Sequence, residues 1–187
     1  MRRIRSLYLA GPSIHLQQGV SLAASARKLC EAAGFAALAP DPDALKEREP
    51  SEAMAREIYA ERISRLRQAD AAIVDLTPFR GPHCDPATAF EAGFMAGLGK
   101  PVFAYMNLPG EEDAELGDRV ESYVGAERDE AGLWRDADGA EIEDFGLPES
   151  LMLWAEARRL YAIVTPDIHG DLTGLQLCLE AVQLYAD

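Results

Sequence analysis

Short apolar runs alternate along the chain with longer segments in which apolar residues recur every three or four positions. The short runs end at glycine, proline or charged residues, which predicts β-strands, and the longer segments predict helices. The expected strands cover residues 4–10, 35–39, 71–76, 101–106 and 160–164. The expected helices cover residues 17–33, 51–68, 86–98, 114–124, 150–157 and 173–185. The third strand is apolar along its length, as expected for a strand buried on both faces of a sheet.

Strands that alternate with helices predict an α/β fold, with a doubly wound parallel sheet of five strands and helices on both faces. Ligands of such sheets bind outside the carboxyl ends of the strands, so the turns after Ala10, Leu76 and Met106 should surround the site. The length of 187 residues fits a single domain. Two segments break the alternation: a proline- and charge-rich loop at 41–50, and an irregular acidic excursion at 107–147.

One carboxylate, Glu91, lies in a segment that is otherwise uncharged, because no other ionisable side chain occurs between Asp85 and Lys100. Asp85 suits a helix N-cap, Pro86 the first helical position and Gly99 the C-terminal stop. The helix between them is apolar on every side and is expected to be buried. A buried carboxylate must be paired, protonated or exposed in a cleft. Glu91 is therefore a candidate nucleophile or general base; the alternative is a glutamate that reaches solvent or forms a structural ion pair.

Other candidate site residues have competing structural explanations. Asp85 is explained as an N-cap, and it could also accept a ligand hydroxyl while repelling phosphate, since a carboxylate has several acceptor positions. Tyr8, near the end of the first strand, could orient Glu91 or be an ordinary strand residue. The pair Gly11-Pro12 and the residue Gly81 could let loops approach a ligand closely, or could serve turn geometry alone.

Composition narrows the possible partners. The formal net charge of −14 at pH 7 argues against nucleic acid and against an anionic membrane surface as partners. The sequence has no apolar segment long enough to span a membrane and nothing that resembles a signal peptide. Its three cysteines are unevenly spaced, form no metal-binding pattern and favour a reducing, cytoplasmic setting.

Cofactor-binding motifs are also absent from the sequence. No G-x-G-x-x-G follows the first strand and there is no Walker A motif, so phosphate-bearing cofactors are not expected. His15, His83 and His169 have no partner at metal-ligand spacing, and they are interpreted as surface or loop histidines. Of the three, His83 alone lies in a candidate site loop. We therefore expect neither a metal ion nor a cofactor.

Taken together, several motifs resemble the nucleoside 2-deoxyribosyltransferase family. The resemblance keeps its order and spacing over roughly residues 7–155. Its first pieces are Tyr8-Leu-Ala-Gly-Pro12 and Ala69-Asp-Ala-Ala-Ile-Val-Asp-Leu-Thr-Pro-Phe-Arg-Gly-Pro82. The next are Asp85-Pro-Ala-Thr-Ala-Phe-Glu-Ala-Gly93, Lys100-Pro-Val-Phe-Ala-Tyr105, and a late active-site segment made of Glu143-Asp-Phe-Gly-Leu-Pro148 and Leu151-Met152.

The resemblance implies a flavodoxin-like fold and transfer of 2-deoxyribose between nucleobases, without metal or cofactor. Glu91 would attack the anomeric carbon to give a covalent deoxyribosyl ester, which a second base would displace with net retention. Tyr8 would align Glu91 through a hydrogen bond. Asp85 would bind the sugar 5′-hydroxyl, which favours plain deoxynucleosides over monophosphates. The other residues that the resemblance places at the substrate are Gly11, Pro12, Arg62, Phe79, Arg80, Gly81, Ser150 and Met152.

The resemblance also implies a homo-oligomer, because family members build each site from two subunits. Met152 of the neighbouring subunit would cover the sugar. Closed symmetry makes a homodimer, or a multiple of dimers, the expected form.

Three positions depart from the family pattern. The family usually has Asp or Asn, which helps to bind or protonate the base, where this chain has Arg62. An arginine cannot donate its proton at neutral pH, but it could bind a base carbonyl or pair with a carboxylate. Asp75 or Glu61 could instead take over the missing role. The other two departures are Ser150 in place of Asn and Ala87 in place of Gly.

Two further functions stay open. In an N-glycosidase, water rather than a base would resolve the intermediate, as expected if Arg62 weakens acceptor binding. A catalytically silent nucleoside-binding or sensor protein would have kept the fold and lost activation of the base.

Overall fold

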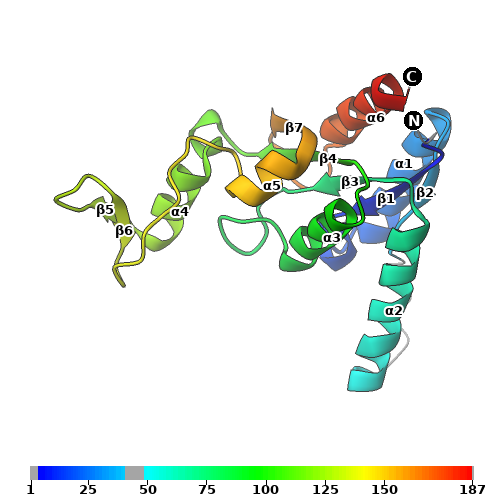
Figure 1. Cartoon of the computed structure of the whole chain (residues 1–187), viewed down its shortest axis with the longest axis horizontal. Helices are drawn as coiled ribbons and strands as arrows, with labels where there is room; N and C mark the ends of the chain where they lie inside the picture. Colours follow the sequence, from blue (N-terminus) through cyan, green and yellow to red (C-terminus); the bar gives the residue numbers. More distant parts are fainter. Residues whose placement is uncertain (1–3, 41–48, 187) are drawn as a thin grey trace.

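The computed structural model describes residues 4–40 and 49–186, and most of the loop expected at 41–50 lies outside this described part. The main sheet contains β1 (Ser6–Ala10), β2 (Ala36–Leu38), β3 (Ala71–Asp75), β4 (Val102–Leu108) and β7 (Ala157–Val164). Its strands run parallel in the order β2-β1-β3-β4-β7 (Figure 1). This confirms the five-stranded flavodoxin-like sheet. The strand order reverses between β1 and β3, which is where such sheets bind ligands.

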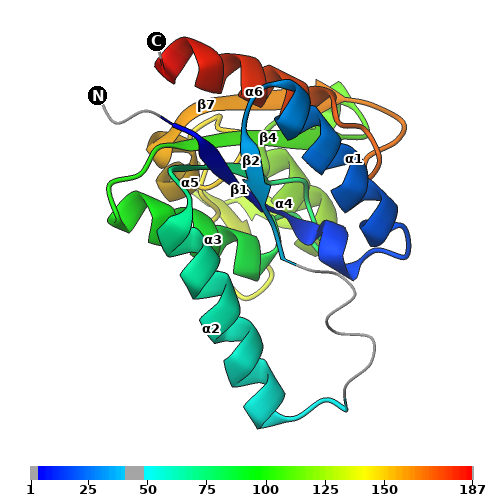
Figure 2. The same cartoon turned by 90° about the vertical axis from the view of Figure 1, so that its right-hand side faces the viewer.

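Helices cover both faces of the sheet, as Figure 2 shows. On one face lie α1 (Gly19–Ala32) and α6 (Thr173–Ala186). On the other lie α2 (Glu52–Gln68), α3 (Pro86–Gly97) and α5 (Leu151–Glu156). All five helices fall at the predicted positions. A short 3-10 helix, η1 (Pro12–His15), joins β1 to α1 and has no counterpart in the predicted elements.

Side chains of the central strands alternate between the two faces of the sheet, because successive residues of a strand point in opposite directions. Tyr8, Val74 and Met106 enter the core beneath α2 and α3. Leu7 and Ile73 enter the core beneath α1 and α6. Both sets are buried, which confirms that β3 is covered on both faces. The alternation also directs the Tyr8 side chain toward the helices from which Glu91 comes.

The excursion predicted at 107–147 is more regular than expected. After η2 (Glu111–Asp113), it contains α4 (Leu116–Val124) and an antiparallel hairpin of β5 (Ala126–Arg128) and β6 (Trp134–Asp136). α4 confirms the predicted helix, whereas the hairpin corrects the expectation of irregular chain. Each strand of the hairpin has three residues and carries charges, so no alternation of apolar residues marks it. The hairpin lies at the end of the molecule opposite α1 and β2 (Figure 1).

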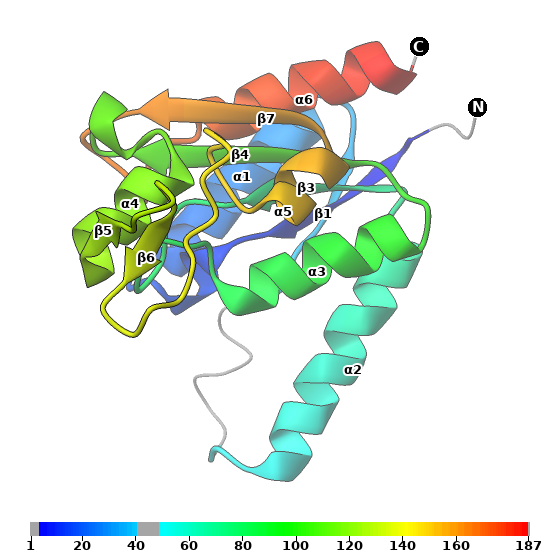
Figure 3. The same ribbon diagram turned by 60° about the vertical axis from the view of Figure 1, so that its left-hand side comes forward.

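Helix α3 is only partly buried, which corrects the expectation that every side of it is covered. One side of the helix packs toward the sheet (Figure 3). Glu91 is buried, whereas Phe90 is 52% exposed and Gly93 also faces solvent. Exposed apolar side chains continue on the neighbouring helices, with Tyr59 on α2 and Met152 on α5. An apolar sequence pattern does not show which side of a helix packs against the rest of the chain and which side stays exposed to solvent.

Within residues 4–40 and 49–186, no helix combines the length and apolar character that a membrane crossing needs. In the same part of the chain, no group of three or more histidine, cysteine or acidic side chains is arranged to hold a metal ion. All three cysteines are free and buried.

Candidate active site

The lone carboxylate of α3 meets a tyrosine from β1. The Tyr8 hydroxyl donates a 2.7 Å hydrogen bond to Glu91 Oε1, and both side chains are buried. Helix α3 begins as predicted, because Asp85 Oδ2 accepts the Thr88 N–H at 3.1 Å and Pro86 occupies the first turn. The cap therefore fixes the start of the helix that carries Glu91.

Arg62 of α2 adds a positive charge to this pair. Its Nη1 lies 3.6 Å from Glu91 Oε1, the same oxygen that accepts the hydrogen bond from Tyr8. Its Nε is buried and has no hydrogen-bond partner in the described part of the chain. Both contacts use Oε1, and neither involves Oε2.

The surroundings of Glu91 raise its pKa. Burial is the largest cause, and the nearby charge of Asp85 adds to it. The hydrogen bond from Tyr8 and the charge of Arg62 act in the opposite direction. Burial and the neighbouring Glu91 raise the pKa of Tyr8, so its phenol stays protonated and donates. A carboxylate with a raised pKa is a stronger base and nucleophile than one in water.

A cleft of about 340 Å³ opens beside Glu91, between α2 and α3. Its walls are mostly apolar, and the residues that border it include Ile58, Tyr59, Arg62, Ala87, Phe90 and Glu91. The volume falls within the range of small-molecule sites, which typically combine apolar walls with a few polar groups. The cleft therefore places mostly apolar walls next to the Glu91 carboxylate.

A small group of side chains gathers where α3 begins. His15 Nε2 lies 3.9 Å from Asp85 Oδ1, and the His15 ring stacks on Phe79 with 5.5 Å between ring centroids. The guanidinium carbon of Arg80 lies 4.8 Å from the centroid of the Phe79 ring. His15 is exposed, which confirms its interpretation as a surface or loop histidine, but it also lies beside Asp85 and was not among the predicted site residues. The unpredicted 3-10 turn η1 brings it to the site.

Three of the predicted site residues have other surroundings. Gly11 borders a separate cavity of about 60 Å³ on the α1 side of the sheet, together with Asp75. A Cβ on Gly11 would lie 2.8 Å from Asp75 Cβ, so the close packing of β1 against β3 requires glycine here. Pro12 is buried at the start of η1. Gly81 borders a third cleft, next to Arg119. Close packing accounts for Gly11, and a φ of 154°, which side chains disfavour, accounts for Gly81.

The two residues considered as replacements for the usual Asp or Asn lie elsewhere. Asp75 borders the cavity on the opposite side of the sheet from Glu91. Glu61 is largely exposed and pairs with Arg65 at 2.5 Å. Arg62 is therefore the charged group of α2 that contacts Glu91.

A buried glutamate joins the loop before α3 to the start of α5. Glu149 is 1% exposed, and it accepts the Cys84 N–H at 3.2 Å and the Ser150 N–H at 2.8 Å. His83 Nδ1 lies 3.2 Å from the same carboxylate. Because Cys84 directly precedes Asp85, Glu149 holds the backbone next to the cap of α3.

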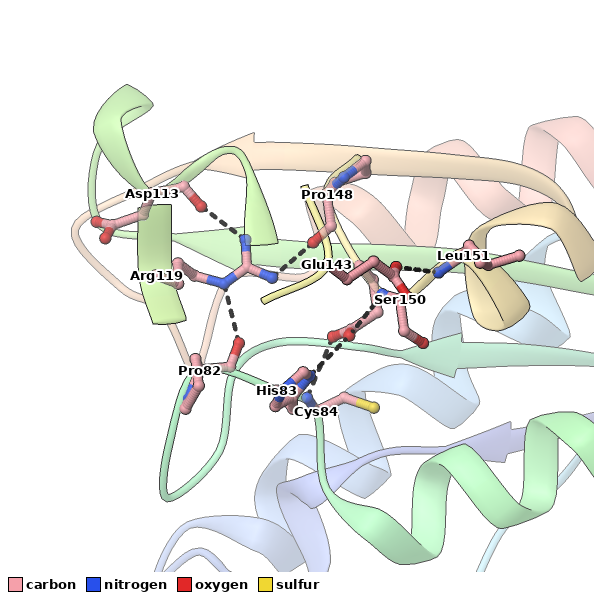
Figure 4. A network of polar contacts seen from close by, with 10 residues as sticks. Pro82, His83, Cys84, Asp113, Arg119, Glu143, Pro148, Ser150 and Leu151 are labelled. Carbon is pink, nitrogen blue, oxygen red and sulfur yellow. Dashed lines mark hydrogen bonds and ion pairs between the residues drawn. The ribbon is translucent and has the colours of Figure 1, made fainter. Parts of the chain in front are cut away.

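Arg119 of α4 makes a second connection in the same region (Figure 4). Its guanidinium donates to three backbone carbonyls, those of Pro82 at 2.9 Å, Asp113 at 2.7 Å and Pro148 at 2.6 Å. The loop before α3 and the segment before α5 are thus fixed to each other. In α5 itself, Met152 is 75% exposed.

Known proteins similar to this chain identify its family. The model of the nucleoside 2-deoxyribosyltransferase family matches residues 7–152. The chain belongs to that family. A 2-deoxyribosyltransferase of Leishmania mexicana is similar in structure, with 29% identity, a TM-score of 0.56, and coverage of 80% of this chain and 85% of its own.

Two further relatives are more distant. A conserved protein of Enterococcus faecalis shares the fold at 15% identity and a TM-score of 0.50, over 97% of this chain and 99% of its own. An uncharacterized protein of Schizosaccharomyces pombe is 26% identical over 163 residues, covering 80% of this chain and 75% of that protein.

The region matched to the deoxyribosyltransferase family runs from β1 to α5 and includes every predicted site residue, from Tyr8 to Met152. Substrates of the family are nucleosides and nucleobases. In this family member, β7 and α6 follow the matched region and complete the sheet and one of its helical layers.

The buried Glu149 of this deoxyribosyltransferase-family chain is held as a carboxylate. Burial raises its pKa, but the hydrogen bonds from His83 and the Ser150 N–H, with the charges of His83 and Arg119, lower the pKa overall. In turn, the hydrogen bond to Glu149 raises the pKa of His83. Neither Glu149 nor Arg119 stands out in the sequence, because both occur within a stretch rich in charged residues.

Proposed function

We propose that the protein transfers 2-deoxyribose between the nucleobases of unphosphorylated 2′-deoxynucleosides, through a covalent ester with Glu91. The observation that supports this most strongly is the buried Tyr8–Glu91 hydrogen bond of 2.7 Å next to an apolar cleft. Family membership supplies the reaction class. We expect the enzyme to act in the cytoplasm, since three free, buried cysteines suit a reducing compartment.

Glu91 would act as the nucleophile. Its Oε2 would attack the anomeric carbon C1′ from the side opposite the base, forming a C1′–O bond as the C1′–N bond breaks. The departing base keeps the bonding electrons and takes up a proton from water, and the acceptor base releases one proton to water when it bonds to C1′. A second base then attacks C1′ and displaces the carboxylate, so that two inversions give net retention. Through Oε1, Tyr8 would hold the carboxylate in one orientation during both steps.

Asp85 would bind the 5′-hydroxyl of the sugar. Oδ2 makes the hydrogen bond that caps α3, while Oδ1 lies toward His15 and can accept a hydroxyl hydrogen. The negative charge would repel a 5′-phosphate, which supports plain nucleosides as the substrates. Phe79 and Arg80 would border the substrate at the same end of the site.

Arg62 would contact both the nucleophile and the base. Nη1 faces Glu91, and Nε is a buried donor with no partner in residues 4–40 and 49–186. Arg62 also borders the cleft, where its guanidinium would donate to a carbonyl oxygen on the base. Arginine donates hydrogen bonds only, so this contact favours bases with a carbonyl at the corresponding edge.

Substitution Arg62→Met is expected to move the acidic limb of the kcat/KM profile to higher pH. The charge of Arg62 lowers the pKa of Glu91, whereas burial raises it. Removal of Arg62 should therefore raise the pKa of Glu91. Because ionised Glu91 is the attacking form, the loss of activity should be several-fold larger at about pH 5 than at about pH 8. Rates measured across this pH range check the prediction. Arg56→Met, on the exposed side of the same helix, is the matched control and should keep the wild-type limb.

Product analysis with deoxyinosine as donor tests the proposed function. Deoxyadenosine or deoxycytidine should form when adenine or cytosine is added, and should not form without an acceptor base. Release of hypoxanthine at the same rate with and without acceptor would instead identify an N-glycosidase. If no product forms, the assay is repeated with thymidine as donor. Tight nucleoside binding without turnover of either donor would identify a silent binding protein.

The exposed apolar side chains of α2, α3 and α5 support a homodimer or higher homo-oligomer with shared sites. Tyr59, Phe90, Met152 and Trp154 are each between 45% and 75% exposed in the single chain. Such a surface is typical of a contact with another subunit. Trp154→Asp is expected to shift the sedimentation coefficient toward the monomer and to lower activity. Leu184→Asp, on α6 at the other face of the sheet, should change neither.

A further inference from the structure

We propose that Glu149 is a positioning residue that sets Asp85 for the 5′-hydroxyl of the nucleoside and so determines selectivity at that end of the sugar. The inference rests on the role proposed above for Asp85. It assigns a function to a buried acid that does not itself touch the substrate.

The Cys84 amide connects Glu149 to Asp85. Glu149 Oε2 accepts the Cys84 N–H at 3.2 Å, which fixes the peptide group one residue before Asp85. Pro86 restricts the backbone on the other side, and the cap bond to Thr88 fixes Oδ2. The position of Asp85 Oδ1 then follows from the positions of Oδ2 and of the Asp85 backbone, because the hydrogen bond to the Thr88 N–H uses Oδ2. A shift of the Cys84 peptide would therefore move the oxygen that is left for the substrate.

The negative charge of Glu149 strengthens its hydrogen bonds, because the residue is only 1% exposed to water. A buried carboxylate is costly unless several donors surround it, and this one has two backbone N–H groups and His83. Charge-assisted hydrogen bonds are stronger than neutral ones and hold their partners more closely. A glutamine of the same shape would keep the packing but weaken the hold on Cys84.

Loss of this hold should not unfold the loop. Arg119 binds the carbonyls of Pro82 and Pro148, and neither hydrogen bond uses the Glu149 side chain. The loop before α3 would stay attached to the segment before α5 while the Cys84 peptide became less well placed. The expected defect is therefore in selectivity toward the 5′ end, with a smaller effect on the rest of the reaction.

The test compares deoxyinosine with 2′,5′-dideoxyinosine as donors to adenine. In the wild type, the ratio of the two kcat/KM values should be about tenfold to hundredfold in favour of deoxyinosine, as for one hydrogen bond to a charged acceptor. In Glu149→Gln, this ratio should fall by about fivefold or more. Both donors are measured on the same preparation, so a lower fraction of folded enzyme cancels from the ratio.

The matched control is Asp129→Asn in the β5–β6 hairpin. Asp129 also accepts two backbone N–H groups and one side-chain donor, from Ala131, Leu133 and Arg135, but it is remote from the site. It should keep the wild-type ratio. An unchanged ratio in Glu149→Gln, beside a clear ratio in the wild type, would overturn the inference and leave the proposed function intact. A wild type that does not distinguish the two donors would overturn the inference together with the role of Asp85.

Discussion

Glu91→Ala is expected to abolish both base transfer and nucleoside hydrolysis, with kcat lowered by roughly a thousandfold or more. Both reactions begin with the same ester, so neither can proceed when the attacking oxygen is removed. The Tyr8 hydroxyl then has no carboxylate to align, and the cleft between α2 and α3 keeps its apolar walls. Chromatography of deoxyinosine with and without adenine measures both products in one experiment.

Two variants control for this result. Glu61→Ala removes an exposed acid of α2 that pairs with Arg65, and it should keep nearly full activity.

Glu91→Gln is the second control and preserves the shape of the side chain. The fold raises the pKa of Glu91 above its ordinary value of 4.5. Protonated Glu91 therefore stabilises the fold below pH 4.5, and this contribution is lost as the pH rises through the raised pKa of the folded state. Glu91→Gln should therefore be inactive yet at least as stable as the wild type at neutral pH. Near wild-type turnover in Glu91→Ala would exclude the ester mechanism.

The candidate site residues that could be predicted are those whose charge or polarity differs from that of the surrounding sequence. Glu91 is the one ionisable residue in an apolar helix, and Asp85 and Pro86 mark where that helix begins. The period of two along β1 directs Tyr8 to the α3 side of the sheet, where it contacts Glu91. These signals are local, because each depends on a few neighbouring residues of known geometry.

The residues that could not be predicted depend on contacts between distant segments. Glu149 is one acid among many in its part of the sequence, and only the approach of the Cys84 loop distinguishes it. His15 reaches Asp85 through a 3-10 turn that no periodicity marks. The exposure of Phe90 follows from which side of α3 the sheet covers. Sequence patterns define helices and strands, but they do not define which loops meet.

Asp85→Ser is expected to exchange one substrate class for another. Without the carboxylate, kcat/KM for deoxynucleosides should fall about tenfold to hundredfold, through loss of a charged acceptor for the 5′-hydroxyl. Removal of the charge should also relax the exclusion of 5′-monophosphates, so that the preference for nucleosides over monophosphates falls by a larger factor. Kinetics with deoxyinosine and its 5′-monophosphate, each with adenine as acceptor, measure both changes.

Serine is the informative replacement because it separates the two roles of Asp85. A serine at the N-cap can still accept the Thr88 N–H, so the stability of α3 should be nearly unchanged, whereas Asp85→Ala would lose about 1 kcal/mol. A melting temperature close to that of the wild type would assign the kinetic change to the substrate contact. Asp85→Asn keeps the shape and the cap without the charge, and it should relax phosphate exclusion as Asp85→Ser does. If both variants kept the wild-type preference for nucleosides, Asp85 would be a helix cap alone, and selectivity against phosphate would have to come from another part of the site.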